Sequence, residues 1–396
     1  MSAAVLQNCL TTRLQQRLAQ RAELGLKRTL VPCTPDADGY VRRLGQRVID
    51  FSSNDYLGLR SNSDIKAEFA CAAALYGLGA GASHLLGGHH PEHVRLENAL
   101  CDWTGRPAAA LFSSGFQAAL GAFGALAEPG DFVLADRLAH ACLLDGARYA
   151  GATLRRFAHN DVASAARLLN AAPADGVRWL VTESVFSMDG DQAELSGLSV
   201  LAKRSGAALM LDEAHAIGVL GPQGSGLAHA VGLDTQSCPV LMLTFGKALG
   251  SAGAAILGST QVIEAIINFS RPWIYTTAMP PALAAATSKA VEITRGADHL
   301  RAQLAESIAR FRAKAKAAGL VLGASETAIQ PVFVGAADVV AISEKLMQSG
   351  FYAPAVRPPT VPKGGARLRV SLRANHTRAQ IDALVSALAR VIAKND

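Results

Sequence analysis

The sequence lacks features that would identify several classes of protein, such as disulfide-bonded and nucleic-acid-binding proteins. Its six cysteines lie far apart and form no Cys-x-x-Cys pair, so they do not indicate a disulfide framework. We interpret them as small apolar side chains in a reducing compartment and therefore expect a cytoplasmic protein. The net charge of +6 comes without a block of lysine and arginine, and without interleaved aromatic residues. Nucleic acid is therefore not an expected partner.

Long apolar runs are also scarce. Residues 107–127 carry no charge and have the length of a membrane span, but serines, glycines and a glutamine interrupt them. The amino terminus lacks the basic, apolar and small-residue pattern of a signal peptide. Leucines recur every four residues from Leu6 to Leu18, with arginines on another face, which predicts an amphipathic helix. We expect no membrane partner.

The chain is long enough to bury a large core and to form more than one domain, because it has 396 residues of which 50% are hydrophobic. We expect an N-terminal helix and a short β segment over residues 1–55. A large α/β domain should follow over 56–285, and a smaller α+β domain over 286–396. The Pro280-Pro281 pair marks the approach to a long helical stretch, roughly 282–319, that links the last two.

Apolar runs that alternate with helical patterns occupy the middle of the chain, which is typical of βαβ units. They predict a doubly wound, mostly parallel sheet of seven strands. The expected strands are Ala109–Phe112, Phe132–Ala135, Thr153–Phe157, Trp179–Thr182, Ala208–Leu211, Leu241–Phe245 and Ala254–Leu257. In such open sheets the ligand lies outside the carboxyl ends of the strands.

Two of these strands end in polar residues that suit one cofactor. Asp212 and His215 follow one strand, and Thr244 and Lys247 end the other. A lysine that can form a Schiff base and an acid that keeps a pyridine nitrogen protonated are the two needs of pyridoxal phosphate, PLP. The alternative is an ion pair at the end of a sheet, which either motif alone could form. Together the two motifs favour a PLP site.

Three more strand ends are polar. Residues 112–117 join a strand to a helix and include Ser114, Gly115 and Phe116, so their N–H groups can take a phosphate. His140 follows another strand, where it could stack on a flat ring or cap a helix. Ser187 lies in the hydrogen-bonding segment 182–190. Five polar strand ends predict one shared crevice.

Six segments carry a resemblance to a known family. They are Ser53-Asn-Asp-Tyr-Leu-Gly-Leu59, Arg156-Phe-Ala-His-Asn-Asp161, Val185-Phe-Ser-Met-Asp-Gly190, Thr244-Phe-Gly-Lys247, Ile274-Tyr-Thr-Thr-Ala-Met-Pro-Pro281 and Arg357-Pro-Pro-Thr-Val-Pro362. Through them the chain resembles the α-oxoamine synthases, PLP enzymes of the aspartate-aminotransferase fold, fold type I. These enzymes condense an amino acid with an acyl thioester and release carbon dioxide. The resemblance runs from about Gly25 to the carboxyl end.

The resemblance implies roles for the cofactor residues. Lys247 would form the Schiff base and carry protons, Asp212 would pair with the pyridinium, and His215 would bind the phenolic oxygen of the ring. The remaining cofactor residues would be His140 over the ring face, Ser187 near the ring oxygen, and Ser114, Gly115, Phe116 and Thr244 around the phosphate. Thr276 or Thr277 would reach the phosphate in a neighbouring subunit, so the resemblance implies a homodimer with shared sites.

The resemblance also implies the substrates. Arg369 would hold the amino-acid carboxylate, and Thr360, Arg28 and Asn54 would face the substrates. The segment 357–362 favours the member that joins L-alanine to a pimeloyl thioester, on coenzyme A or on acyl carrier protein. Glycine-using relatives, such as 2-amino-3-ketobutyrate ligase or 5-aminolevulinate synthase, would share every cofactor residue. A chain that binds PLP without catalysis is a further alternative, because fold alone does not prove activity.

The histidine-rich segment 87–93 raises the possibility of a metal site. Pro91 and the glycines before it favour a loop that enters a helix, and no further ligand follows at a suitable spacing. We therefore expect no metal.

Overall fold

The computed structural model describes residues 3–36, 39–173, 175–335, 338–362 and 364–393, with the backbone alone for residues 3–8. The chain divides into two compact units, residues 1–49 and 50–396. Among the described residues, no helix combines the length and the apolar character that crossing a membrane requires.

The first unit consists of a helix followed by a small antiparallel sheet. Helix α1 (Ala3–Glu23) confirms the helix expected from the leucine spacing. Strand β2 (Tyr40–Arg43) pairs with β1 (Cys33–Pro35) on one side and with β3 (Gln46–Asp50) on the other. The turn between β2 and β3 has two central residues, Leu44 and Gly45, with φ of 49° and 77°. Positive φ at both positions matches the twist of a two-residue hairpin.

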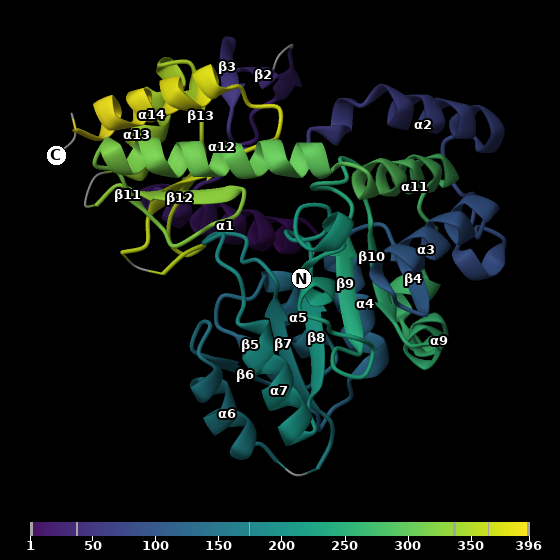
Figure 1. The fold of residues 1–396 in the computed structure, drawn as a ribbon. Helices are drawn as coiled ribbons and strands as arrows, with labels where there is room; N and C mark the ends of the chain where they lie inside the picture. The colour runs from purple at the N-terminus through teal and green to yellow at the C-terminus, as the bar shows by residue number, and fades with distance from the viewer. Residues whose placement is uncertain (1–2, 37–38, 174, 336–337, 363, 394–396) are drawn as a thin grey trace. The chain divides into compact units, whose positions relative to one another are not determined.

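The second unit contains the expected seven-stranded sheet, and every strand predicted from the sequence is present (Figure 1). The strand order is β4-β10-β9-β8-β7-β5-β6. The strands are β4 (Ala108–Phe112), β5 (Phe132–Asp136), β6 (Thr153–Phe157), β7 (Arg178–Glu183), β8 (Ala208–Asp212), β9 (Val240–Thr244) and β10 (Ala254–Gly258). Strand β10 is antiparallel to both of its neighbours, whereas the pairs from β9 to β6 are parallel.

Helices cover this sheet, which explains why inner strands such as β8, β9 and β10 are apolar along nearly their whole length, whereas the edge strand β6 is largely exposed. Alternating apolar residues of the strands, including Val133, Val181 and Met242, join one core cluster. Helices α4 (Gly115–Leu126), α5 (Ala141–Tyr149) and α9 (Thr260–Phe269) contribute to that cluster. Helices α6 (Val162–Asn170) and α7 (Leu195–Ser205) pack against one another elsewhere on the sheet.

The long helical stretch expected at 282–319 is interrupted. It consists of α11 (Pro281–Arg295) and α12 (Asp298–Ala317). Arg301 explains the interruption, because its guanidinium donates to the carbonyl oxygens of Thr294 (2.7 Å) and Arg295 (3.3 Å). A cationic side chain thus satisfies carbonyls at the end of α11 that a continuous helix would use internally.

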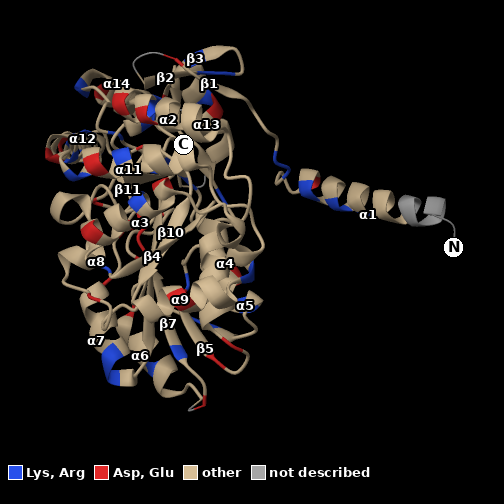
Figure 2. Ribbon diagram, turned by 90° about the vertical axis from the view of Figure 1, so that its right-hand side faces the viewer, with Lys and Arg blue, Asp and Glu red and all other residues tan. Residues whose placement is uncertain are grey.

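The carboxyl-terminal part is α+β, as expected. Its antiparallel sheet has the order β11-β12-β15-β14. The strands are β11 (Val321–Leu322), β12 (Ile329–Phe333), β14 (Ala355–Val356) and β15 (Arg367–Ser371), with α13 (Val339–Gln348), β13 (Phe351–Tyr352) and α14 (Arg378–Ala393) around them. In Figure 2 charged residues of both signs are scattered over helices such as α12 and α14. The domain boundaries at 55 and 285 stay predictions.

Further helices complete the second unit. They are η2 (Leu59–Ser61), α2 (Ser63–Tyr76), η3 (His84–Leu86), α3 (Pro91–Thr104), η4 (Pro222–Gly224), α8 (Leu227–Ala230) and α10 (Arg271–Ile274). Helix α3 begins at Pro91, which confirms the reading of segment 87–93 as a loop that enters a helix.

A buried carboxylate at the start of β5 provides a test of this packing. Asp131 accepts hydrogen bonds from the backbone N–H groups of Glu128 (3.1 Å) and Val177 (2.8 Å) and from the indole of Trp179 (3.2 Å). We expect Asp131→Ala to lower the free energy of unfolding by about 2–4 kcal/mol, because it leaves the buried indole of Trp179 and two part-buried backbone N–H groups without their acceptor. Urea denaturation measures this loss. Asp131→Asn keeps one acceptor oxygen and should lose less; equal losses in both variants would contradict the account.

Candidate active site

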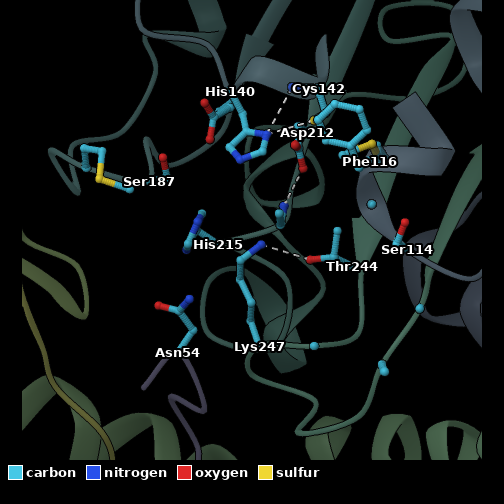
Figure 3. A pocket seen from close by; sticks show the side chains of 18 of the residues that line it. Asn54, Ser114, Phe116, His140, Cys142, Ser187, Asp212, His215, Thr244 and Lys247 are labelled. Carbon is cyan, nitrogen blue, oxygen red and sulfur yellow. Dashed lines mark hydrogen bonds between the residues drawn. The ribbon is translucent and has the colours of Figure 1, made fainter. Parts of the chain in front are cut away.

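The five polar strand ends meet at one cavity of about 510 Å³ at the carboxyl edge of the seven-stranded sheet. Strand β10 runs the other way, so its amino end contributes Ala252 and Gly253. The polar residues that line the cavity are Asn54, Ser113, Ser114, His140, Cys142, Glu183, Ser187, Asp212, His215, Thr244, Lys247 and Arg369. Figure 3 shows that Lys247, Asp212 and His140 point into the same space. The predicted convergence is confirmed.

Lys247 follows the end of β9 and is held by its own strand. Its Nζ lies 3.2 Å from Oγ1 of Thr244, to which it donates. Burial lowers the pKa of Lys247, and the negative charge of Asp212 partly offsets that effect. A lysine with a lowered pKa is more often neutral, and a neutral amine is the form that attacks a carbonyl or accepts a proton.

Asp212 ends β8 and is almost completely buried. One of its oxygens, Oδ1, accepts from the backbone N–H of Ala214 at 2.8 Å. Burial raises the pKa of Asp212, whereas the positive charge of Lys247 and the Ala214 hydrogen bond lower it. A buried carboxylate beside a cation is suited to hold a second cationic group, such as a protonated pyridine.

Two histidines line the cavity on different elements. His140 caps α5, since its Nδ1 accepts from the backbone N–H of Cys142 (3.3 Å) and lies 3.0 Å from the sulfur of the same residue. The helix-capping alternative is therefore confirmed; His140 also lines the cavity, and its stacking on a flat ring stays a prediction. His215 is buried, and its Nδ1 lies 2.7 Å from the hydroxyl of Tyr56. Burial lowers the pKa of each imidazole.

The loop before α4 forms the end of the cavity that suits a phosphate. Ser114 is the N-cap of α4, and its side chain accepts from the N–H of Gln117 at 3.2 Å. A Cβ added at Gly115 would lie 2.7 Å from Cγ2 of Thr244, so only glycine leaves room there. A helix N-terminus of this kind favours an anion.

Arg369 brings the carboxyl-terminal sheet to the cavity. It lies on β15 and is buried, with Nε donating to the carbonyl of Ser187 at 2.7 Å. Nη1 and Nη2 both donate to Oδ1 of Asn54 at 3.1 Å. An amide oxygen thus occupies the forked edge of the guanidinium, which is the edge that grips a carboxylate.

Four predicted site residues do not line the cavity. Thr276 is half-buried and Thr277 is exposed, in the segment that follows α10. Thr360 is exposed in the turn after Arg357, to whose carbonyl its N–H donates at 3.0 Å. Arg28 is exposed and belongs to the first unit. The roles of these four residues stay predictions.

Sequence reasoning did not assign a role to three residues that the structure places at the site. Glu183 ends β7, lines the cavity and has a buried Oε1 without a hydrogen-bond partner among the described residues. Cys142 had been interpreted only as an apolar side chain, although it follows His140 by two positions. Tyr56 lay inside segment 53–59, but nothing in the sequence indicated that it meets His215.

A cluster of histidines lies outside the cavity. Nδ1 of His84 lies 2.8 Å from Nδ1 of His89, and the His84 ring stacks on Trp273 with centroids 4.8 Å apart. His93 completes a group whose ligand atoms lie within 4.8 Å of one another. Both nitrogens of His93 already face backbone groups, namely the N–H of His90 (2.9 Å) and the carbonyl of Met279 (2.8 Å). These bonds leave His93 without a lone pair for a metal.

A charged network supports the loop that carries Ser187. His159 lies between Asp136 (2.9 Å from Nδ1) and Asp191 (2.8 Å from Nε2), and its ring packs edge-on against Phe186. Burial lowers the pKa of His159, but the hydrogen bonds and charges of the two carboxylates outweigh burial and raise it to about 10. The imidazolium therefore connects the end of β5 to the loop after β7.

These residues fit PLP. The glycine at the helix N-terminus leaves space for a phosphate, the buried Asp212 suits a ring nitrogen, and Lys247 supplies the amine. Oε1 of Glu183 adds a buried polar atom that no hydrogen bond of the described residues satisfies. Fold and site together define a PLP-dependent transferase of fold type I.

Comparisons with known proteins agree with this class. Residues 46–388 match the family described as aminotransferase class I and II. The chain is 49% identical over 346 residues to an 8-amino-7-oxononanoate synthase of Stutzerimonas stutzeri, covering 87% of this chain and 88% of that protein. It is 48% identical over 396 residues to one of Alkalilimnicola ehrlichii, covering 99% and 100%. A solved structure of SPT with a PLP internal aldimine superposes with a TM-score of 0.89, at 29% identity over 96% of each chain.

The chain therefore belongs to the class I and II aminotransferase family and, within it, to the 8-amino-7-oxononanoate synthases, which are PLP-dependent acyltransferases. This result confirms the resemblance to the α-oxoamine synthases on which the sequence analysis relied.

The network around His159 predicts a stability that depends on pH. The folded-state pKa of about 10 exceeds the ordinary value of 6.5, so the ionic contribution is fully present below about pH 6.5 and is lost as pH rises through 10. We expect His159→Gln to lower the free energy of unfolding by about 1.5–3 kcal/mol at pH 6. The difference from the parent protein should shrink steadily towards pH 10. Urea denaturation across this range checks it, and a difference that does not change with pH would refute it.

Proposed function

We propose that this chain joins L-alanine to a pimeloyl thioester in biotin biosynthesis. The products are 8-amino-7-oxononanoate, carbon dioxide and the free thiol of coenzyme A or acyl carrier protein. One observation carries the proposal: Arg369, whose forked edge now holds the amide oxygen of Asn54, lines the same cavity as Lys247 and Asp212. An amino-acid substrate requires a group that binds its carboxylate and, close to that group, an amine that can transfer protons. The names of the close relatives support this substrate pair.

One group of residues in the cavity would hold the cofactor. PLP, when bound, supplies an electron sink that allows bonds at the amino-acid Cα to break. Asp212 would keep the pyridine nitrogen protonated, His215 would donate to the ring oxygen, and the N-terminus of α4 would hold the phosphate. These residues would hold the cofactor by its ring nitrogen, its ring oxygen and its phosphate.

Lys247 and Arg369 act on the substrate. Thr244 holds the amine of Lys247 at the edge of the cavity, where it can take the Cα proton and later return one to the product. Arg369 would exchange its contact with Asn54 for the substrate carboxylate, and two parallel hydrogen bonds would then fix the direction of the Cα–H bond.

The choice of substrates can be tested directly. Purified protein with PLP is assayed for thiol release with alanine, glycine and serine, each against acyl thioesters of several chain lengths on both carriers. We expect the highest kcat/KM for alanine with the pimeloyl group. A preference for glycine with a short acyl group would overturn the proposal in favour of a glycine-using relative.

We also infer a homodimer whose two sites are shared between subunits. Support comes from Thr276 and Thr277, which do not line the cavity that holds Lys247 and Asp212. Apolar side chains near them are exposed, with Tyr275 at 72%, Leu85 at 55% and Leu86 at 81%. These segments are neighbours, because the N–H of Ala278 donates to the carbonyl of Ala82 at 3.0 Å. A second copy of the chain would cover this apolar surface.

A cytoplasmic location is part of the same proposal. Its support is the cysteine pattern, since all six cysteines, Cys9 to Cys238, are free.

Arg369 offers a test of substrate binding. We expect Arg369→Ala to lower kcat/KM for alanine about 30-fold to several thousandfold, because the loss of one partner of a buried charge pair costs about 2–5 kcal/mol. PLP affinity should stay near that of the parent. Arg369→Lys keeps the charge but not the fork, so it should recover only part of the loss. Equal kcat/KM in Arg369→Ala and the parent would remove Arg369 from the site.

Complementation tests whether the sites are shared. Lys247→Ala and the double variant Thr276→Ala/Thr277→Ala should each have little activity alone. A mixed dimer has one site with Lys247 from one chain and both threonines from the other, so refolding the two together should restore up to about half the parental activity per mixed dimer. The absence of restored activity in a dimer shown to be mixed would mean that each site is built from one chain.

A further inference from the structure

Tyr56 is the one buried tyrosine hydroxyl that meets a cavity histidine among the described residues. It lies in the segment between β3 and η2 and is only 1% exposed. Its hydroxyl lies 2.7 Å from Nδ1 of His215, which is 159 positions away in the sequence. The two rings are tilted by 46° with their centroids 6.1 Å apart, so the close contact is the one between these polar atoms. His215 therefore has a fixed partner on its inner nitrogen.

The hydroxyl proton of Tyr56 has two possible acceptors. The second is Oδ1 of Asn54, at 3.2 Å. That oxygen already accepts from Nη1 and Nη2 of Arg369, each at 3.1 Å. A carbonyl oxygen has two lone pairs, and both are engaged by the guanidinium. The shorter contact to His215 is therefore the one in which Tyr56 donates.

The protonation states agree with this direction. Burial raises the pKa of Tyr56 to about 12, although the nearby Arg369 opposes the rise, so the hydroxyl keeps its proton. Burial lowers the pKa of His215 well below its ordinary value, and the positive charges of Lys247, Arg369 and His140 act in the same sense. A neutral imidazole has one N–H group. With Nδ1 as the acceptor, that N–H is on Nε2.

We propose that Tyr56 is a positioning residue that fixes the Nε2–H tautomer of His215 and so makes the histidine a hydrogen-bond donor in the cavity. A donor is what a phenolate-like ring oxygen of PLP needs, whereas the other tautomer would present a lone pair to it. The inference deepens the proposed function, since it concerns how the same site holds its cofactor. It does not depend on the identity of the amino acid or the thioester.

Nitrogen NMR on the full-length protein without cofactor tests the tautomer. Protein labelled with ¹⁵N in histidine is observed at neutral pH, and the His215 signals are assigned with His215→Gln. The parent should show a pyridine-type Nδ1 and a protonated Nε2. A protonated Nδ1 in the parent overturns the proposal, and this result requires no change at Tyr56.

The variant Tyr56→Phe tests the cause. It should convert the His215 signals to a mixture of tautomers and weaken PLP affinity about tenfold, the loss of one net hydrogen bond. Asn54→Ala is the matched control, because it removes a neighbour of the same hydroxyl and should leave the tautomer unchanged. If Tyr56→Phe lowers stability but keeps a pure Nε2–H tautomer, Tyr56 is only structural and the proposal fails. Thiol release is not measured here, so failure of this test is distinguishable from failure of the substrate assignment.

Discussion

The burial of two opposite charges at one edge of a parallel sheet is the constraint on which the site depends. Asp212 and Lys247 follow neighbouring strands, and the β8–β9 register places Asp212 beside Met242. Burial disfavours both charged forms, since it raises the pKa of Asp212 and lowers that of Lys247. Each charge partly offsets the cost of the other. The strand pairing thus fixes a carboxylate and an amine at the same edge of the sheet.

The carboxyl-terminal sheet completes the cavity through hydrogen bonds to the loop after β7. Arg369 donates to the carbonyl of Ser187, Arg367 pairs with Asp189, and Thr327 donates to the carbonyl of Gly190 at 2.8 Å. A Cβ at Gly190 would lie 2.3 Å from the carbonyl oxygen of Ile329, so the two backbones approach more closely than another residue would allow. The carboxylate grip is therefore placed by the same contacts that join the two sheets.

The sequence predicted the strands and the strand-end residues because both depend on local pattern. An apolar run that stops at Asp212 or Thr244 indicates a buried strand, and this prediction does not require knowledge of the strands with which it pairs. The interruption between α11 and α12 could not be predicted, because it depends on Arg301 reaching back to carbonyls of the preceding helix. Tyr56 was missed for a similar reason: its partner His215 is distant in the sequence, and only the folded chain brings the two atoms together.

Glu183 shows how the sheet register also controls ionisation. It is paired with Asp212 across β7 and β8 and is just as buried. Burial raises the pKa of Glu183 well above its ordinary value, and the negative charge of Asp212 adds a smaller effect in the same direction. Two adjacent buried carboxyl groups cannot both ionise at low cost. Lys247 lowers the pKa of both carboxyl groups, but only for Asp212 is it the leading influence against burial. The arrangement therefore favours a single negative charge on Asp212, beside the lysine.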